Sequence, residues 1–93
     1  MIWFVYILRC GNGSYYVGHS INTNARLLRH KAGTGARHTA VYCAERMVYQ
    51  EPFDTEIEAV RRERQLKRWS RAKKEALIAG NLQGLRELAR SHD

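Results

Sequence analysis

An uninterrupted apolar run near the start of the chain constrains its fold more than any other feature. Residues 2–8 are all apolar and rich in β-branched and aromatic side chains, a pattern typical of a strand buried on both faces of a sheet. A second strand-like run, residues 15–19, follows the turn Gly11-Asn12-Gly13. Two such runs around a glycine-containing turn predict an antiparallel hairpin, with the first run at the centre of the sheet.

The length of this turn decides whether Tyr6 and Tyr16 lie on the same face of the hairpin. A two-residue Asn12-Gly13 turn, the strongest hairpin signal, puts the two tyrosines on opposite faces. A three-residue loop with its last glycine in the left-handed region pairs Tyr6 with Gly18 and puts both tyrosines on one face. If Tyr6 and Tyr16 act together, the loop must have three residues.

Caps and terminators predict the remaining elements along the chain. They are a helix from an Asn22 or Thr23 cap to about residue 31, a mobile basic loop over 33–39, a strand over 46–51 closed by Pro52, a helix over 56–69 started by Thr55 and Glu58, a helix from Ser70 to Gly80, and a last helix from Asn81 to Leu88. With 93 residues, we expect one domain over 1–93.

The charge balance points to a polyanionic partner. Lys and Arg number 16 against 9 Asp and Glu, giving a net charge of +7, so we expect nucleic acid as the partner. No run reaches the length of a membrane span, and the apolar start lacks the features of a signal peptide. Cys10 and Cys43 with His19 and His38 lack the paired spacing of zinc ligands. We expect a cytoplasmic protein with reduced cysteines, and no protein partner is evident.

The first predicted helix separates polar from apolar side chains. At 100° per residue, Arg26 and His30 lie about 40° apart, while Leu27 and Leu28 point the other way. We expect the leucine face to be buried and the Arg/His face to be presented. The alternative is an ordinary solvated face.

The helix over 56–69 carries one acid on its apolar stripe. Ala59, Val60 and Leu66 all lie within about 60° of Glu63, so this carboxylate is expected to face the core. A buried carboxylate needs a cation as partner. That cation is either a metal ion or, as a structural alternative, Lys67 or Arg26.

These side chains suit phosphodiester hydrolysis. The reaction needs an activated water and stabilisation of charge on the phosphoryl oxygens. Arg26 suits bidentate contact with phosphate, Glu63 suits a Mg²⁺ or Mn²⁺ ion that keeps most of its waters, and His30 suits proton shuttling. A tyrosine relays a proton only where a cation lowers its pKa.

The order of these parts resembles the GIY-YIG nuclease superfamily, and most of all its small stand-alone bacterial members of the YhbQ type. The resemblance rests on Tyr6-Ile7, Tyr16-x-Gly18, Arg26-x-x-x-His30 and Glu63. It implies an α/β (α+β) fold with a three-stranded antiparallel sheet flanked by helices, and divalent-metal-dependent cleavage of nucleic acid.

The resemblance also implies roles for individual residues. Tyr6 would be the general base, Tyr16 would orient the water, Arg26 would stabilise the transition state, His30 would match the family's helix histidine, and Glu63 would bind the metal. The substrate-binding residues expected are Gly18, Arg37, His38, Lys67 and Asn81. Asn81 is followed by Leu-Gln-Gly-Leu, which departs from the family's usual continuation, and Val5 stands where the first glycine would be.

Eight of the 16 basic residues lie between Arg61 and Lys74, which predicts a phosphate-binding ridge. Phosphate contacts read no sequence, so we expect little sequence specificity, and aromatic side chains near the site favour single-stranded or branched DNA. Two other classes stay open: a catalytically silent nucleic-acid-binding module on the same fold, and an adaptor whose basic ridge docks an acidic protein.

Overall fold

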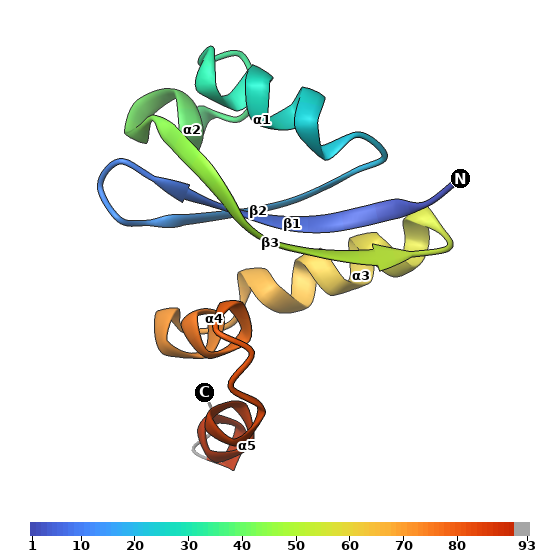
Figure 1. The fold of residues 1–93 in the computed structure, drawn as a ribbon, viewed down its shortest axis with the longest axis vertical. Coiled ribbons are helices and arrows are strands. Elements are labelled where there is room, and N and C mark those ends of the chain that lie inside the picture. Colours follow the sequence, from blue (N-terminus) through green and yellow to red (C-terminus); the bar gives the residue numbers. More distant parts are fainter. Residues whose placement is uncertain (91–93) are drawn as a thin grey trace.

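A central antiparallel sheet organises the computed structural model, which describes residues 1–90 (Figure 1). Its strands are β1 (Trp3–Cys10), β2 (Tyr15–Ser20) and β3 (Ala44–Phe53), in the order β2-β1-β3. The side chains of residues 5–8 in β1 are buried. The expected central position of the first apolar run is therefore confirmed, and β2 is left with one free edge.

The hairpin between β1 and β2 has the three-residue loop. Tyr6 pairs with Gly18 and Leu8 with Tyr16, and the Cys10 amide donates to the Ser14 carbonyl at 2.8 Å. Gly13 has φ +84°, a conformation that glycine adopts without strain. Because side chains alternate along a strand, this register places Tyr6 and Tyr16 on the same face of the sheet.

Helices cover the two faces of the sheet separately. In Figure 1, α1 (Thr23–Lys31) and α2 (Arg37–Tyr42) lie on one side, and α3 (Glu56–Lys67) lies on the other. Tyr6 and Leu8 belong to the core under α1, whereas Val5 and Ile7 pack with Ala59 and Leu66 of α3. The fold class expected from the sequence, a three-stranded antiparallel sheet flanked by helices, is confirmed.

The orientation expected for α1 was wrong. Its boundaries match, since Asn22 caps the helix by accepting from the Ala25 amide. Leu28, however, is 69 % exposed and His30 only 3 %. The sheet face below α1 carries tyrosine hydroxyls, and a buried hydroxyl needs a hydrogen-bonding partner. Leu27 and His30, three residues apart, therefore form the inward stripe.

Two further elements differ from expectation. The segment expected as a mobile loop over 33–39 leads into α2, a six-residue helix whose N-cap residue, Ala36, makes no side-chain capping bond, so no sequence signal marked its start. Strand β3 begins earlier than expected and runs through Pro52, which pairs with Phe4. Because β3 is an edge strand, it tolerates a residue without an amide proton.

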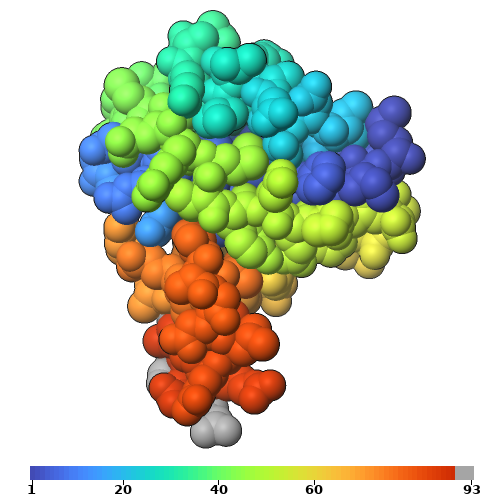
Figure 2. All heavy atoms as spheres, viewed as in Figure 1, coloured from blue at the N-terminus to red at the C-terminus, as the bar shows by residue number. Residues whose placement is uncertain are grey.

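The last two helices, α4 (Arg71–Ile78) and α5 (Leu82–Arg90), extend away from the sheet as a narrow arm (Figure 2). Ser70 caps α4 as expected, accepting from the Lys73 amide. Arg71 joins α4 to the hairpin by donating to the Gly13 carbonyl at 2.6 Å and lying over the Tyr15 ring. Within residues 1–90, each helix is too short or too polar to cross a membrane.

Candidate active site

A cleft of about 470 Å³ opens at the free edge of β2. Strands β1 and β2, helices α1 and α3, and the loop before α2 all contribute side chains to its wall. Six of the residues expected at the site line this one cleft: Tyr6, Tyr16, Gly18, Arg26, His30 and Glu63. Residues spread over most of the chain are thus brought together, as the sequence predicts for a shared site.

Gly18 gives Tyr6 access to the strand edge. A Cβ atom at position 18 would lie 2.5 Å from Tyr6 Oη and 2.6 Å from Cζ. The Tyr6 side chain therefore lies across Gly18, its paired residue on β2, so the glycine of the second motif is required by the tyrosine of the first.

A chain of hydrogen bonds fixes the proton positions behind Tyr6. Tyr6 Oη lies 3.0 Å from His30 Nε2, and His30 Nδ1 lies 2.6 Å from Thr39 Oγ1. The Thr39 hydroxyl donates its single proton to the Ala36 carbonyl at 3.0 Å, so it must accept from His30 Nδ1–H. His30 Nε2 then carries no proton in the neutral ring, and the Tyr6 hydroxyl donates to it.

Burial controls the protonation of both partners. It lowers the pKa of His30 below 6.5, and the charges of Arg26 and Arg29 lower it further. Burial also raises the pKa of Tyr6 well above 10, with smaller increases from Tyr16 and Glu63 and an opposing effect of Arg26. Near neutral pH this pair is a phenol donating to a neutral imidazole.

Tyr16 lies beside this pair with its hydroxyl available. Its ring centroid is 4.9 Å from that of His30 and 6.5 Å from that of Tyr6. Within residues 1–90, no protein group hydrogen-bonds its hydroxyl. The His38 ring centroid is 6.1 Å from that of Tyr16, and a His38 ring nitrogen lies 2.9 Å from Ser14 Oγ. His38 therefore supports Tyr16 from outside the cleft wall.

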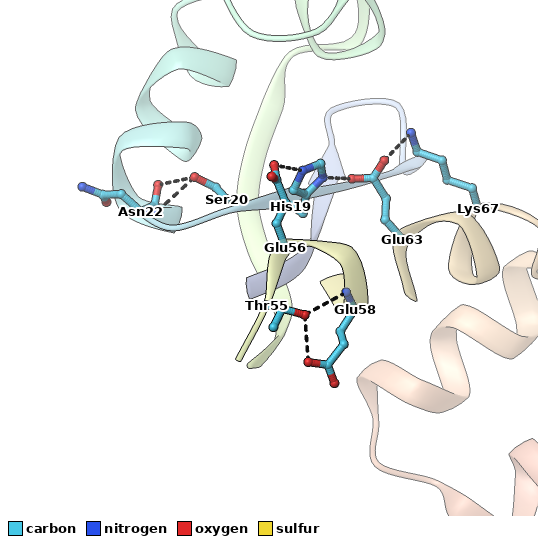
Figure 3. A network of polar contacts seen from close by, with 8 residues as sticks. All are labelled: His19, Ser20, Asn22, Thr55, Glu56, Glu58, Glu63 and Lys67. Atoms are coloured by element: carbon cyan, nitrogen blue, oxygen red, sulfur yellow. Dashed lines mark hydrogen bonds and ion pairs between the residues drawn. The ribbon is translucent and has the colours of Figure 1, made fainter. Parts of the chain in front are cut away.

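Glu63 reaches the cleft from the opposite face of the sheet, because it belongs to α3 (Figure 3). Its carboxylate is 15 % exposed, and it accepts from His19 Nδ1 at 2.7 Å and from Lys67 Nζ at 2.9 Å. Burial alone would raise the pKa of Glu63, but the hydrogen bonds from His19 and Lys67 and the charge of Lys67 outweigh burial, so this pKa lies below 4.5. Glu63 is therefore ionised.

His19 and Glu56 also lie at this end of the cleft. Figure 3 shows the His19 ring between the two carboxylates, with Nε2 3.4 Å from Glu56 Oε2. The sequence analysis assigned neither residue to the site. Two signals were present: the three-residue loop places His19 on the face opposite Tyr16, and Glu56 lies about 20° from Glu63 on the same helix.

The donor set at Glu63 suits a single hydrated divalent ion. Among residues 1–90, no three His, Cys, Asp or Glu side chains converge as a ready metal cage. One ionised carboxylate opening on a cleft is nevertheless the kind of site that Mg²⁺ uses when it keeps most of its waters. Glu63 would be the residue that holds such an ion, in place of its present ion pair with Lys67.

The remaining expected site residues lie outside the cleft wall. Arg37 is exposed at the start of α2. Lys67 does not line the cleft and contacts its wall through the ion pair with Glu63. Asn81 lies between α4 and α5, where its side chain accepts from the Gly84 amide at 2.9 Å. The structure does not bring Asn81 to the cleft, because α4 and α5 extend away from the sheet (Figure 1).

Comparisons with known proteins point to one family. A family model described as the GIY-YIG catalytic domain matches residues 2–76. UPF0213 proteins of Staphylococcus aureus strains N315 and Mu50 are each 44 % identical over 75 residues, which is 81 % of this chain and 92 % of the relative. The solution NMR structure of a UPF0213 protein from Bacillus halodurans is 35 % identical, with a TM-score of 0.53, and the match covers 87 % of this chain and 86 % of that one.

Proposed function

Because the chain belongs to the GIY-YIG family, a nuclease-type family, we propose that it is a divalent-metal-dependent nuclease that hydrolyses phosphodiester bonds in DNA with little sequence specificity. The observation that supports this most is the meeting of Tyr6 and Glu63, from opposite faces of the sheet, in one cleft with Arg26. Single-stranded or branched DNA is the proposed substrate, since aromatic rings next to the cleft offer stacking surfaces for unpaired bases.

The chemistry expected from the sequence requires a lowered tyrosine pKa, whereas burial raises that of Tyr6. In the proposed mechanism, Tyr6 therefore relays a proton to His30 without becoming a free phenolate. Its hydroxyl oxygen accepts a proton from the attacking water while its own proton passes to His30 Nε2, 3.0 Å away. The raised pKa of Tyr6 disfavours a free phenolate, and the lowered pKa of His30 keeps the accepting nitrogen unprotonated. Tyr16 orients the water with its available hydroxyl.

Two charged side chains would stabilise the phosphoryl group. Arg26 is exposed, lines the cleft and makes no ion pair within residues 1–90, so its guanidinium can take two phosphoryl oxygens. Glu63 would hold a Mg²⁺ or Mn²⁺ ion, which when bound supplies Lewis-acid stabilisation of the phosphoryl charge. Lys67, released from Glu63, would then be available to a neighbouring phosphate.

The proposal is tested by a cleavage assay with Mn²⁺ or Mg²⁺ on single-stranded, duplex and branched DNA. Glu63→Gln should lower cleavage by at least about 100-fold, because it removes the charged metal ligand, while DNA binding is kept. Glu58→Gln is the matched control: it removes one carboxylate from the same helix at an exposed position. Wild-type cleavage by Glu63→Gln would overturn the role given to Glu63.

A catalytically silent nucleic-acid-binding module is the second candidate, and one observation favours it. Glu63 already pairs with the Lys67 ammonium and accepts a hydrogen bond from His19, so its carboxylate has partners without a metal ion. Calorimetry with Mn²⁺ separates the two candidates. A silent module would bind DNA but would neither bind the ion at Glu63 nor cleave.

A further inference from the structure

Three arginines, two on α3 and one at its C-cap, have side chains with no role in the fold or in the cleft. Arg61, Arg64 and Arg68 are exposed, and within residues 1–90 none of their guanidinium groups takes part in a hydrogen bond or an ion pair. At 100° per residue they lie within about 60° of one another. They form a continuous stripe along the outward side of α3, called the arginine stripe below.

Several other basic side chains of this segment make contacts within the protein. Arg62 donates to Glu51 at 3.3 Å and to Gln65 at 2.7 Å, and its guanidinium lies 5.1 Å from the centroid of the Trp69 ring. The Lys73 ammonium lies 4.5 Å from the same centroid. The ridge expected from the sequence therefore includes side chains that stabilise the fold. The three side chains of the arginine stripe make no such contacts.

The arginine stripe begins where the cleft ends. Lys67 contacts Glu63 in the cleft wall, and Arg64 lies about 60° further around the same helix. Trp3, Ile21 and Glu56, which also line the cleft, contribute apolar and acidic groups and no positive charge. A polyanion bound by Arg26 in the cleft therefore meets further positive charge where it passes Lys67 and Arg64.

We infer that the arginine stripe carries the sugar-phosphate backbone of DNA as it leaves the cleft across α3. Side chains three and four residues apart on a helix have Cβ atoms about 5–6 Å apart, so the three guanidinium groups can contact successive phosphates. Arginine also presents paired donors that match phosphate oxygens. The path into the cleft rests on the proposed function, whereas DNA binding by the stripe is measured separately from cleavage.

The test is the salt dependence of DNA affinity, measured by fluorescence anisotropy in metal-free buffer so that the probe stays intact. A triple variant, Arg61→Gln, Arg64→Gln and Arg68→Gln, is compared with a control triple, Lys31→Gln, Arg46→Gln and Arg86→Gln. The control residues are exposed and lie on α1, β3 and α5. Both variants lose three positive charges from the net +7.

The stripe variant should bind a labelled single strand at least about 10-fold more weakly, and the slope of log K against log salt should become shallower by about 2 to 3, since each phosphate contact contributes about 0.7–0.9. The control should keep most of the wild-type slope. Equal losses of DNA affinity in both variants, or an unchanged salt slope in the stripe variant, would overturn the inference. An unchanged slope would leave an acidic protein as the partner of the stripe. If wild-type protein fails to cleave but the stripe variant loses slope, the proposed function fails and the stripe stands.

Discussion

Gly18→Ala tests the packing that brings Tyr6 to the edge of the sheet. The added Cβ would lie 2.5 Å from Tyr6 Oη and 2.6 Å from Cζ, whereas unstrained carbon contacts need about 3.5–4.0 Å. The ring must therefore move by about 1 Å, and Tyr6, which is buried, has little room to do so. The substitution should cost about 1–3 kcal/mol of stability, the usual effect of overpacking.

The larger effect of Gly18→Ala should be on catalysis. A displacement of about 1 Å breaks the alignment of Tyr6 Oη with His30 Nε2, and misplacements of that size lower rates by about 100-fold. The assay is single-turnover DNA cleavage with Mn²⁺, well below the melting temperature of the variant. Nitrogen-15 NMR of His30 reports in parallel whether Nε2 still accepts the Tyr6 proton.

Gly80→Ala controls for lost stability alone. Gly80 has φ +70° and no atom within 4 Å of its added Cβ, so alanine there should cost about 1 kcal/mol through backbone strain without touching the cleft. Its cleavage rate should remain that of the wild type. If Gly18→Ala cleaves like Gly80→Ala and keeps the His30 signal unchanged, the reasoning from the Tyr6–Gly18 contact is refuted.

Three further predictions follow from the cleft. Cleavage should fall as the pH drops through the lowered pKa of His30, because protonated Nε2 accepts no proton from Tyr6; a flat acid limb would contradict this. The free energy of unfolding should also fall as the pH drops below about 6.5, because between that pH and the lowered pKa of His30 only the unfolded chain binds the proton. Denaturant titrations at several pH values should show this loss in wild type and not in His30→Gln. Identical pH dependence in both proteins would count against the prediction. Lys67→Met should tighten Mn²⁺ binding about twofold by calorimetry, since the half-exposed ion pair with Glu63 that the metal must displace is worth only about 0.3–0.5 kcal/mol. Weaker binding would mean that Lys67 positions Glu63 for the ion.

Local signals predicted the parts of the fold that depend on local chemistry. The Gly11-Asn12-Gly13 turn limited the hairpin to two registers, and the requirement that Tyr6 and Tyr16 act together selected the register that the structure has. Asn22 and Thr55 marked helix starts correctly because each accepts a backbone amide proton as an N-cap. Such bonds form within a few residues, so the sequence alone is sufficient to find them.

Features that depend on tertiary contacts could not be predicted in the same way. The inward turn of His30 depends on the Tyr6 hydroxyl beneath it and on Thr39 in an unpredicted helix. The apolar stripe around Glu63 indicated that this acid lies against the sheet, but it did not indicate which face of the sheet its helix covers. In the structure, Glu63 belongs to the helix on the opposite face and reaches the cleft at the free edge of β2.

The central claim is that the Tyr6–His30 pair activates the water that attacks a phosphodiester bond in this cleft. The most direct measurement is the single-turnover cleavage rate of Tyr6→Phe with saturating Mn²⁺, alongside its affinities for DNA and for Mn²⁺. The account predicts a fall of at least about 100-fold in rate, with both affinities unchanged. Cleavage by Tyr6→Phe at the wild-type rate would contradict it.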